Sequence, residues 1–566
     1  MNREEIEKRY EQWVACAAEN DELADELQAM KDDPKKKEDA FFKDLSFGTG
    51  GLRGILGAGP NRMNVYTVAR AARGVAAYVK ANFAPSERRI AISYDSRIHS
   101  DLFARISAQV FAGAGIEAWI YPELMPTPCL SFAVRQLRCA AGVMVTASHN
   151  PAEYNGYKVY GPDGCQITEE AAAQILARIE AEEMFGAEEL SSFEEGLAAG
   201  QIRLIGEDVY AEYVRRVSEQ SVLTAEENID KNVSIVYTPL NGTGLKPVLR
   251  TLKENGYGNI TVVEEQREPD GSFPTCPYPN PEIREAMELG IRYAAREDAE
   301  LVLATDPDCD RVGIAVKGPE GRHVLLSGNE TGMLLLDYLC ARRAEQRRLP
   351  ENPVFIKTIV TTDMAQRIAA RYGVGCINVL TGFKYIGEQI GRLEREGRAE
   401  DFVFGFEESY GYLSGSYVRD KDGVVASLLI CEMFAWYKSR GVALYDRLME
   451  LYKEYGFCLN TLHSYSFPGA AGFVRMQEIM KSLRESSEIF AGIQITERKD
   501  YRDGIDGLPP SDVLRFALEG GGSVVIRPSG TEPKIKAYIC VSALDQAAAK
   551  AAEAELAEEL ARRMEQ

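Results

Sequence analysis

The chain has no C-x-x-C pair, no long uninterrupted apolar run and no excess of basic residues. Its eleven cysteines are scattered along 566 residues, which favours reduced thiols over a disulfide framework. The longest apolar stretch, residues 423–437, is interrupted by Glu432 and is shorter than a membrane span. The N-terminal segment is charged and contains no apolar core of a signal peptide. These absences predict a soluble, cytoplasmic protein.

The charge balance excludes one class of partner and sets a condition on another. Acidic residues outnumber basic ones by 86 to 65, which gives a formal net charge of −21. Nucleic acid and anionic membranes bind positive surfaces, so neither is expected as a partner. The sequence indicates no obligate protein partner either. If the ligand is a small anion, the basic side chains that bind it must be gathered in one site.

Length and periodicity predict several α/β domains. A chain of 566 residues with 45% hydrophobic and 27% charged residues is too long for one core. Short apolar runs alternate with amphipathic helical segments, which favours mixed or parallel sheets built from βαβ units. We expect a helical lead-in followed by four domains, with the bounds 1–45, 46–210, 211–325, 326–450 and 451–566.

Four strand-like runs end directly in polar or glycine-rich loops. They are "AAGVMV" before "TASHNP", "AELVLA" before "TDPDCDR", "DFVFGF" before "EESYG", and "GGSVVI" before "RPSGTEPK". In open α/β sheets, ligands bind beyond the carboxyl ends of the strands. The four loops therefore predict one cleft to which each domain contributes a loop.

The second of these loops predicts a metal site. Asp306, Asp308 and Asp310 stand at alternate positions, so an extended loop would point their carboxylates to one side. Three adjacent carboxylates repel one another, and a hard divalent cation relieves that repulsion. A calcium loop is excluded, because Arg311 and Lys317 stand where glycine and glutamate are needed. Magnesium fits an all-oxygen set of three ligands, and a solvated acidic turn is the alternative.

Ser148, in the first loop, has two interpretations. A serine after a strand is commonly a helix N-cap, and the chain lacks the G-x-S-x-G elbow of serine hydrolases. The other interpretation makes Ser148 a reactive group. His149 is then either a base or a structural hydrogen-bonding residue, and Lys158 supplies a nearby cation.

Two segments carry anion-binding side chains. Residues 47–54 are rich in glycine and include Thr49 and Arg53, but they match neither a Walker loop nor a dinucleotide fingerprint. Their backbone N–H groups and the arginine fork suit an anion, with a plain tight turn as the alternative. The "RPSGTEPK" loop is more specific, because it gathers phosphate-binding donors in Arg527, Ser529, Gly530, Thr531 and Lys534.

Two further segments suit the rest of a sugar phosphate. Glu407 and Ser409, after a strand, present groups that bind sugar hydroxyls, and a solvated acidic turn is the alternative. Thr381 and Gly382 follow the apolar run "INVL" and are candidate substrate contacts. Lys384, two residues later, is a candidate for acid–base chemistry or for a phosphate contact.

Taken together, the four loops resemble the α-D-phosphohexomutase superfamily over roughly residues 45 to 540. The resemblance implies four α/β domains around a central cleft. Pro307 and Cys309 stand where many members have glycine, and Phe406 interrupts the usual Gly-Glu-x-Ser pattern. These variations resemble the branch of glucose and mannose mutases and phosphopentomutases.

The resemblance also implies a chemistry. Ser148 would carry a phosphoryl group that completes the Mg²⁺ shell of the three aspartates. The expected reaction moves phosphate between the 1- and 6-positions of glucose through a hexose 1,6-bisphosphate, which also primes the enzyme. Phosphomannomutase, phosphopentomutase and glucose 1,6-bisphosphate synthase are the alternatives, and a phosphoserine-based magnesium phosphatase is a rival of another class. The residues implied near the transferring group are Arg53, His149, Lys158, Arg311 and Lys384, with Glu407 and Ser409 on the sugar.

Overall fold

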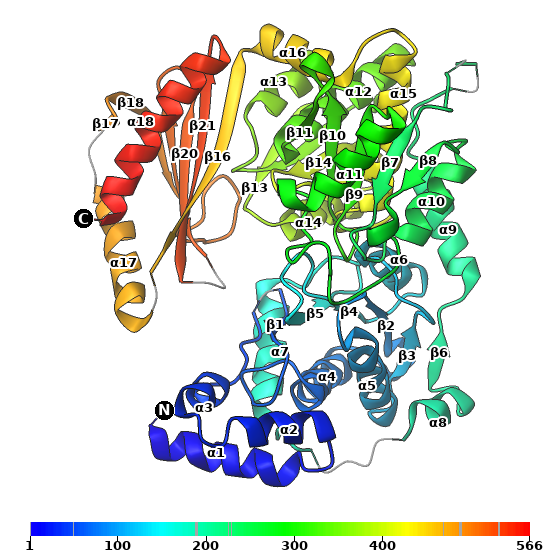
Figure 1. Cartoon of the computed structure of the whole chain (residues 1–566), viewed down its shortest axis with the longest axis vertical. Coiled ribbons are helices and arrows are strands. Elements are labelled where there is room, and N and C mark those ends of the chain that lie inside the picture. The colour runs from blue at the N-terminus through cyan, green and yellow to red at the C-terminus, as the bar shows by residue number, and fades with distance from the viewer. Residues whose placement is uncertain are drawn as a thin grey trace.

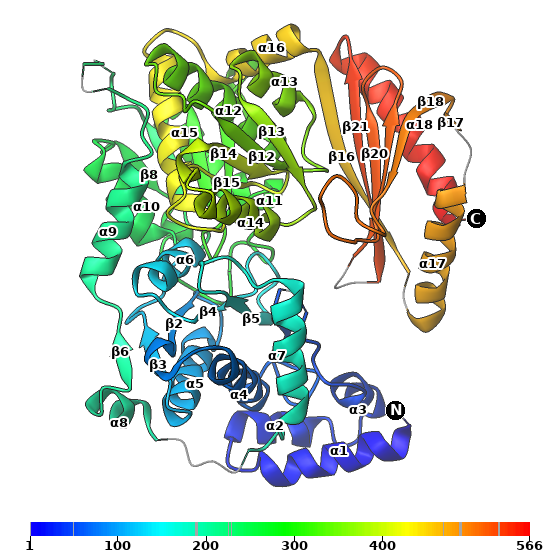
Figure 2. The same cartoon turned by 180° about the vertical axis from the view of Figure 1, so that it is seen from behind.

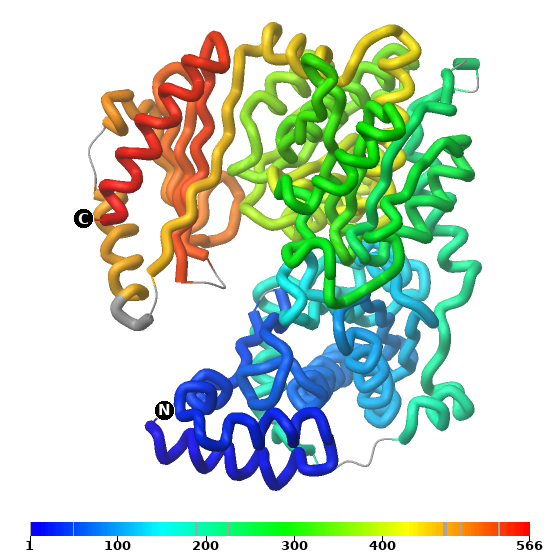
Figure 3. Tube along the Cα trace, viewed as in Figure 1, coloured from blue at the N-terminus to red at the C-terminus, as the bar shows by residue number. Residues whose placement is uncertain are grey.

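Four β-sheets follow a group of N-terminal helices in the computed structural model (Figure 1; Figure 2). The structure describes residues 2–48, 50–186, 191–224, 226–227, 229–467, 469–485, 489–529 and 533–565. The trace in Figure 3 passes from one sheet to the next in chain order.

Three capped helices form the N-terminal segment. They are α1 (Arg3–Cys16), α2 (Asp21–Ala29) and α3 (Pro34–Phe41). Asn2, Asn20 and Asp33 each accept a hydrogen bond from a backbone N–H of the first helical turn, which satisfies donors that the helix leaves free. The buried Trp13 and Phe41 rings meet edge to face at 6.1 Å, and this small core continues onto residues of the first sheet's layer.

The first sheet has the strand order β1-β5-β4-β2-β3-β6, with parallel pairing from β4 through β2 and β3 to β6 and antiparallel pairing at β5 and β1. Its strands are β1 (Leu52–Ile55), β2 (Arg89–Tyr94), β3 (Glu117–Ile120), β4 (Ala141–Val145), β5 (Tyr154–Tyr160) and β6 (Ile202–Leu204). Its helices are α4 (Val65–Asn82), η1 (Pro85–Glu87), α5 (Ser100–Gly113), α6 (Thr127–Gln136), α7 (Glu169–Ala181), α8 (Phe193–Ala198) and α9 (Glu207–Ser218).

The second and third sheets share one hydrophobic core, which also includes buried residues of α6 and α9. The second sheet comprises β7 (Ile235–Thr238), β8 (Ile260–Val262), β9 (Leu301–Thr305), β10 (Val312–Lys317) and β11 (His323–Leu326), with α10 (Leu245–Glu254), η2 (Glu264–Gln266), α11 (Arg284–Glu297) and η3 (Pro319–Gly321). The third comprises β12 (Val354–Thr358), β13 (Gly375–Val379), β14 (Phe402–Glu407) and β15 (Gly411–Leu413), with α12 (Gly328–Glu345), α13 (Met364–Arg371), α14 (Phe383–Arg395), η4 (Ala399–Asp401), α15 (Gly423–Lys438) and α16 (Leu444–Tyr455).

The apolar stretch noted in the sequence forms α15, which is buried within this shared core. Glu432 interrupts the stretch, and its buried carboxylate accepts hydrogen bonds from the Val222 N–H at 3.0 Å and the Tyr338 hydroxyl at 3.1 Å. Within the described residues, the helices do not combine the length and apolar character that a bilayer crossing requires.

The fourth sheet is antiparallel throughout, whereas the sequence favoured mixed or parallel sheets. Its elements are β16 (Phe457–Ser466), α17 (Gly469–Glu485), β17 (Ile489–Phe490), β18 (Ile493–Asp500), β19 (Leu514–Leu518), β20 (Ser523–Pro528), β21 (Lys534–Ala543) and α18 (Gln546–Glu565). Gly520 and Gly521, with φ of 87° and 88°, make the tight turn between β19 and β20. A turn this short joins only antiparallel strands.

Candidate active site

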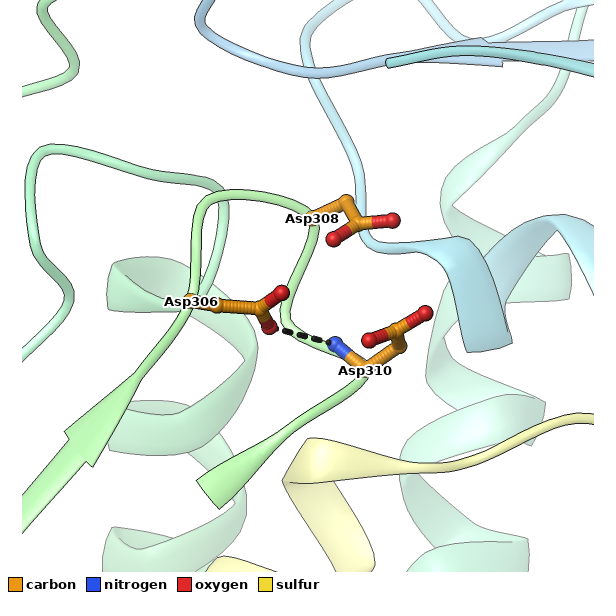
Figure 4. Close-up of side chains that lie close together, drawn as sticks. All are labelled: Asp306, Asp308 and Asp310. Carbon is orange, nitrogen blue, oxygen red and sulfur yellow. Dashed lines mark hydrogen bonds between the residues drawn. The ribbon is translucent and has the colours of Figure 1, made fainter. Parts of the chain in front are cut away.

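The three aspartates of the second loop lie together directly after β9. Their carboxylates are buried, one oxygen from each lies within 4.8 Å of the others, and Figure 4 shows all three facing one space. The loop is not extended as expected. Cys309 has a φ of 49° and donates its N–H to the Asp306 carbonyl at 2.9 Å, which forms a turn. The turn, rather than strand alternation, brings the carboxylates together.

Asp306 and Asp308 are held by different kinds of hydrogen-bond donor, backbone N–H groups at Asp306 and side chains at Asp308. Asp306 Oδ1 accepts the N–H groups of Asp310 and Arg311 at 3.1 and 3.0 Å. Asp308 Oδ2 accepts from Lys158 Nζ at 2.7 Å and from Thr127 Oγ1 at 2.9 Å. Burial, with the neighbouring carboxylates, raises the pKa of Asp306 well above its usual range. At Asp308 the Lys158 ammonium outweighs burial and holds the pKa below its usual range.

The donor set fits a hard divalent cation. Among the described residues, Asp308 Oδ1 and Asp310 Oδ1 are buried without a hydrogen-bond partner, although Arg311 Nε lies 3.7 Å from Asp310 Oδ1. An unpaired buried carboxylate oxygen is costly, and a cation bound by oxygen ligands would satisfy both atoms. The cluster can therefore hold a metal ion through Asp306, Asp308 and Asp310.

Ser148 lies against this cluster from the first sheet. Its side chain is buried, and Oγ donates to Asp306 Oδ2 at 2.8 Å and lies 3.1 Å from His149 Nδ1. No helix begins after Ser148, since the next element among these described residues is β5, so the N-cap interpretation is wrong. Ser148 has a φ of 52°, which only a few per cent of residues other than glycine adopt.

Arg97 supports the Ser148 loop and was missed from the sequence. Its buried guanidinium donates to backbone carbonyls along this loop, those of Ser148 at 2.6 Å, Asn150, Pro151 at 2.8 Å and Tyr154 at 2.9 Å. The Asp95 carboxylate lies 3.5 Å from Nε. The sequence did contain a signal for Arg97. Like the four loops, the "YDSR" segment (94–97) places polar side chains at the carboxyl end of a strand, here β2.

Two of the predicted cations lie against the aspartates, and a third contacts the Ser148 loop. Lys158 projects from β5 onto Asp308, as described. Arg53, on β1, donates from Nη1 to Asn150 Oδ1 at 3.1 Å. Arg311 donates from Nη1 to Glu282 Oε1 at 2.8 Å and to the Ser409 carbonyl at 3.1 Å. Burial, together with these cations, keeps the pKa of His149 well below its usual value.

A fourth cation, Lys421, was also missed. Its Nζ lies 3.2 Å from Asp310 Oδ2 and 3.1 Å from Asp420 Oδ1. Although burial opposes its charge, the neighbouring carboxylates raise its pKa. The surrounding segment "RDKDG" matches no motif, so the position of Lys421 beside the aspartates could not be predicted from the sequence.

The predicted sugar-binding loop after β14 contacts the predicted metal-binding loop after β9. Glu407, the last residue of β14, is buried, and burial raises its pKa to about 7 against the opposing effect of Lys421 and Arg311. Ser409 Oγ donates to Glu408 Oε1 at 3.2 Å, and the Ser409 carbonyl accepts from Arg311. Arg311 therefore links the two predicted loops.

The Lys384 group lies at the start of α14. Gly382 has a φ of 120°, and the Thr381 Oγ1 atom is buried with no hydrogen-bond partner among the described residues. Burial lowers the pKa of Lys384, whose Nζ lies 3.9 Å from Glu169 Oε1 on α7. Lys384 on α14 therefore lies beside α7, a helix that packs with the first sheet.

The predicted phosphate loop lies between β20 and β21. Arg527 Nη2 donates to the Tyr538 hydroxyl at 3.4 Å, and Arg527 Nε is buried without a hydrogen-bond partner in the part of the chain that the structure describes. The Ser529 N–H donates to the Lys534 carbonyl at 2.8 Å across the hairpin. Thr49, Gly530 and Thr531 lie outside the described residues.

The chain matches four domain families in order along its length. They are described as Phosphoglucomutase/phosphomannomutase, alpha/beta/alpha domains I, II and III, at residues 44–185, 211–321 and 327–455, and the C-terminal domain at 474–559. A phosphoglucomutase of Staphylococcus haemolyticus is 35% identical over 519 residues, which cover 89% of this chain and 92% of the relative. The chain belongs to the phosphoglucomutase/phosphomannomutase family. As a member, it is a mutase, an enzyme of the isomerase class.

Solved structures of this family share the fold. A putative phosphomannomutase from Thermus thermophilus has a TM-score of 0.67 at 22% identity, with 93% of this chain and 100% of that chain covered. An N-acetylphosphoglucosamine mutase of Aspergillus fumigatus, solved with GlcNAc-6P and magnesium, has a TM-score of 0.53 at 14% identity and covers 98% and 99% of the two chains. The predicted α/β architecture of the phosphohexomutases is thus confirmed.

Proposed function

We propose that this family member interconverts α-D-glucose 1-phosphate and glucose 6-phosphate in the cytoplasm, through a phosphoryl group carried on Ser148. The observation that carries the proposal is the position of Ser148 Oγ, buried and 2.8 Å from Asp306 Oδ2. A phosphoryl group on this oxygen would lie among the three aspartates and the cations Lys158, Arg53 and Arg311. An acidic chain thereby gathers positive charge where an anionic substrate needs it.

In the forward half-reaction, a free hydroxyl of the bound sugar monophosphate attacks phosphorus. The bond from phosphorus to Ser148 Oγ breaks as the bond to the sugar oxygen forms, giving the hexose 1,6-bisphosphate. Lys384, whose pKa is lowered by burial, takes the proton of the sugar hydroxyl. The departing serine oxygen takes up a proton from solvent, which the neutral His149, 3.1 Å from Oγ, can relay by accepting at one ring nitrogen and donating from the other. The bisphosphate then reorients, and its other phosphoryl group returns to Ser148.

The remaining groups bind and orient. Glu407 and Ser409 accept the sugar hydroxyls, while Arg527, Ser529 and Lys534, with Gly530 and Thr531, bind the phosphate that is not reacting. When bound by the three aspartates, Mg²⁺ supplies positive charge that neutralises the transferring phosphoryl. The Aspergillus enzyme was solved with magnesium and a sugar phosphate, which supports the same class of ligands here.

The names of the staphylococcal relatives favour glucose over mannose, ribose or deoxyribose phosphates. A phosphatase would need neither the sugar-binding residues Glu407 and Ser409 nor a second phosphate-binding loop.

The deciding assay incubates the enzyme with glucose 1-phosphate, Mg²⁺ and a trace of glucose 1,6-bisphosphate. We expect isomerised product, dependence on the bisphosphate primer and no free phosphate. Free phosphate as the main product contradicts the mutase, and faster turnover of mannose or ribose 1-phosphate reassigns the sugar.

Glu407 predicts an acid limb in the pH profile. Its carboxylate must be ionised to accept two sugar hydroxyls, and burial places its pKa at about 7. As pH falls through that value, KM for glucose 1-phosphate should rise. Glu407→Gln removes the titrating group, so its KM should be high at every pH and the limb should flatten. A limb that persists in Glu407→Gln shows that another group, such as the substrate phosphate, causes it.

Arg97 predicts a loss of rate without a loss of binding. Arg97→Lys keeps a charge beside Asp95 but replaces a planar fork with a point donor, so the Ser148 loop loses carbonyl contacts. Displacing a reacting group by about 1 Å costs roughly 100-fold in rate. We therefore expect kcat to fall about 100-fold with KM little changed. Arg105→Lys, on the exposed face of α5, is the control, and an unchanged kcat in Arg97→Lys rejects the role.

A further inference from the structure

A second cavity lies away from the candidate active site. It has a volume of about 740 Å³ and is formed by the C-terminal parts of α6, α12 and α14, the segment after α9, and the loop after β15, elements that Figure 2 labels. The residues that line it do not include those of the serine, metal, sugar or phosphate loops. Small-molecule sites usually enclose roughly 300–1,000 Å³, so the cavity is large enough for a metabolite.

Positive charge exceeds negative charge in its lining. Four arginines, Arg135, Arg216, Arg343 and Arg348, face three glutamates. One glutamate, Glu394, already pairs with both Arg135 and the buried Arg419, at 2.7 Å from each. A local excess of arginine in a chain of net charge −21 is the feature expected of an anion site.

Arg343 and Arg348 carry most of this excess. Within the described part of the chain, neither has a carboxylate within 4.0 Å, while most arginines of this protein do. Arg343 Nη2 has a long hydrogen bond of 3.4 Å to Ser414 Oγ, and Arg348 Nη1 lies 3.2 Å from Gln346 Oε1. Burial, with the charge of Arg348, lowers the pKa of the half-buried Arg343. Both arginines line the same cavity, and Glu400 of its lining partly offsets their charge.

Helix polarity explains only part of this arrangement. Arg135, Arg216 and Arg343 lie in the last turns of α6, α9 and α12, where a cation offsets the partial negative charge of the helix end. Arg348 lies beyond α12, whose C-cap is Gln346, and adds a third charge at a helix end where Arg342 and Arg343 already lie in the last turn. Two arginines that line one cavity favour an anionic ligand there.

We propose that this cavity is a second ligand site, which binds a phosphorylated small molecule with its phosphate between Arg343 and Arg348. Arginine forks match phosphate oxygens with paired hydrogen bonds. The lining also offers Gln220, Ser221 and Ser416, which suit hydroxyl groups of the ligand, and the rings of Phe132 and Tyr417. The cavity is also connected to the candidate active site along the chain. Tyr417, in its lining, lies four residues before Lys421, which contacts Asp310.

The test counts binding sites by titration calorimetry of the full chain with inorganic phosphate and with adenosine triphosphate. The candidate active site also binds phosphate, so wild-type protein should bind two equivalents of at least one probe. The double variant Arg343→Gln/Arg348→Gln should lose one equivalent and keep the other. Arg322→Gln, an exposed arginine on the turn after β10, is the matched control and should keep both.

The single variant Arg348→Glu provides a check that does not depend on the half-buried arginine. Arg348 is exposed, so this variant should fold normally and weaken the second site at least tenfold. Loss of one equivalent in both variants, with unchanged thermal unfolding, supports the site. One equivalent in the wild type, or two in the double variant, overturns the proposal and leaves the arginines as neutralisers of helix ends.

Discussion

Replacing Ser148 with alanine should abolish mutase turnover while leaving the protein folded. In the proposed mechanism the serine oxygen breaks and reforms its bond to phosphorus in each cycle, and no other hydroxyl in the described residues donates to Asp306. Losing the nucleophile of a covalent mechanism costs about 10⁴-fold or more in rate. The lost hydrogen bond to Asp306 should lower the free energy of unfolding by only about 1 kcal/mol.

The control for Ser148→Ala is a buried serine of the same domain that lies away from the chemistry. Ser107, on α5, is buried and donates to the Phe103 carbonyl at 2.7 Å. Ser107→Ala should lose a similar amount of stability and keep full activity. Rates with bisphosphate primer, together with thermal unfolding, separate the two effects. Activity within tenfold of wild type in Ser148→Ala would show that the phosphoryl group is carried elsewhere.

Two substitutions in the metal loop should change stability in opposite directions. Burial and like charges raise the pKa of Asp306 in the folded state, so its ionised form destabilises the metal-free fold at neutral pH. Asp306→Asn should therefore raise the melting temperature of the metal-free enzyme. Asp308 has a lowered pKa because of Lys158, and its contribution is fully present above about pH 5. Asp308→Asn breaks that buried pair and should cost about 3 kcal/mol or more.

Both variants should lose activity by about 10³-fold, because each removes a proposed ligand of the charge-neutralising cation. In wild-type protein, Mg²⁺ at about 100 times its Kd should add about 2.7 kcal/mol to the free energy of unfolding, and neither variant should show that gain. The measurement is thermal unfolding in chelator, followed by Mg²⁺ titration. A less stable metal-free Asp306→Asn, or a full Mg²⁺ response in either variant, contradicts this account of the cluster.

The four strands that precede the motif loops were predicted correctly from the sequence. The runs before Ser148, Asp306, Glu407 and Arg527 are all strands, β4, β9, β14 and β20, because apolar runs ending in polar loops report buried strands reliably. The family and its four-domain architecture followed from the same loops. The structure brings Ser148, Lys158 and Arg311 against the aspartates, whereas Arg53 contacts Asn150 of the Ser148 loop.

Other features depended on contacts that sequence spacing does not record. The aspartates converge through a turn at Cys309, whose left-handed backbone was not foreseen. Lys421 meets Asp310 only because the segment after β15 returns to β9's loop. Arg97 acts on backbone carbonyls, which any sequence supplies, so no residue pattern marks its partners. The antiparallel fourth sheet was missed because its glycine turn was outweighed by the βαβ pattern of the preceding sheets.

The central claim is that Ser148 carries the phosphoryl group, and labelling tests it most directly. Enzyme incubated with Mg²⁺ and radiolabelled glucose 1,6-bisphosphate, with the label in its phosphate groups, should acquire stoichiometric label on the peptide that contains Ser148. Added glucose 6-phosphate should then remove the label as bisphosphate. Enzyme that turns over glucose 1-phosphate but never carries label at Ser148 would contradict the account.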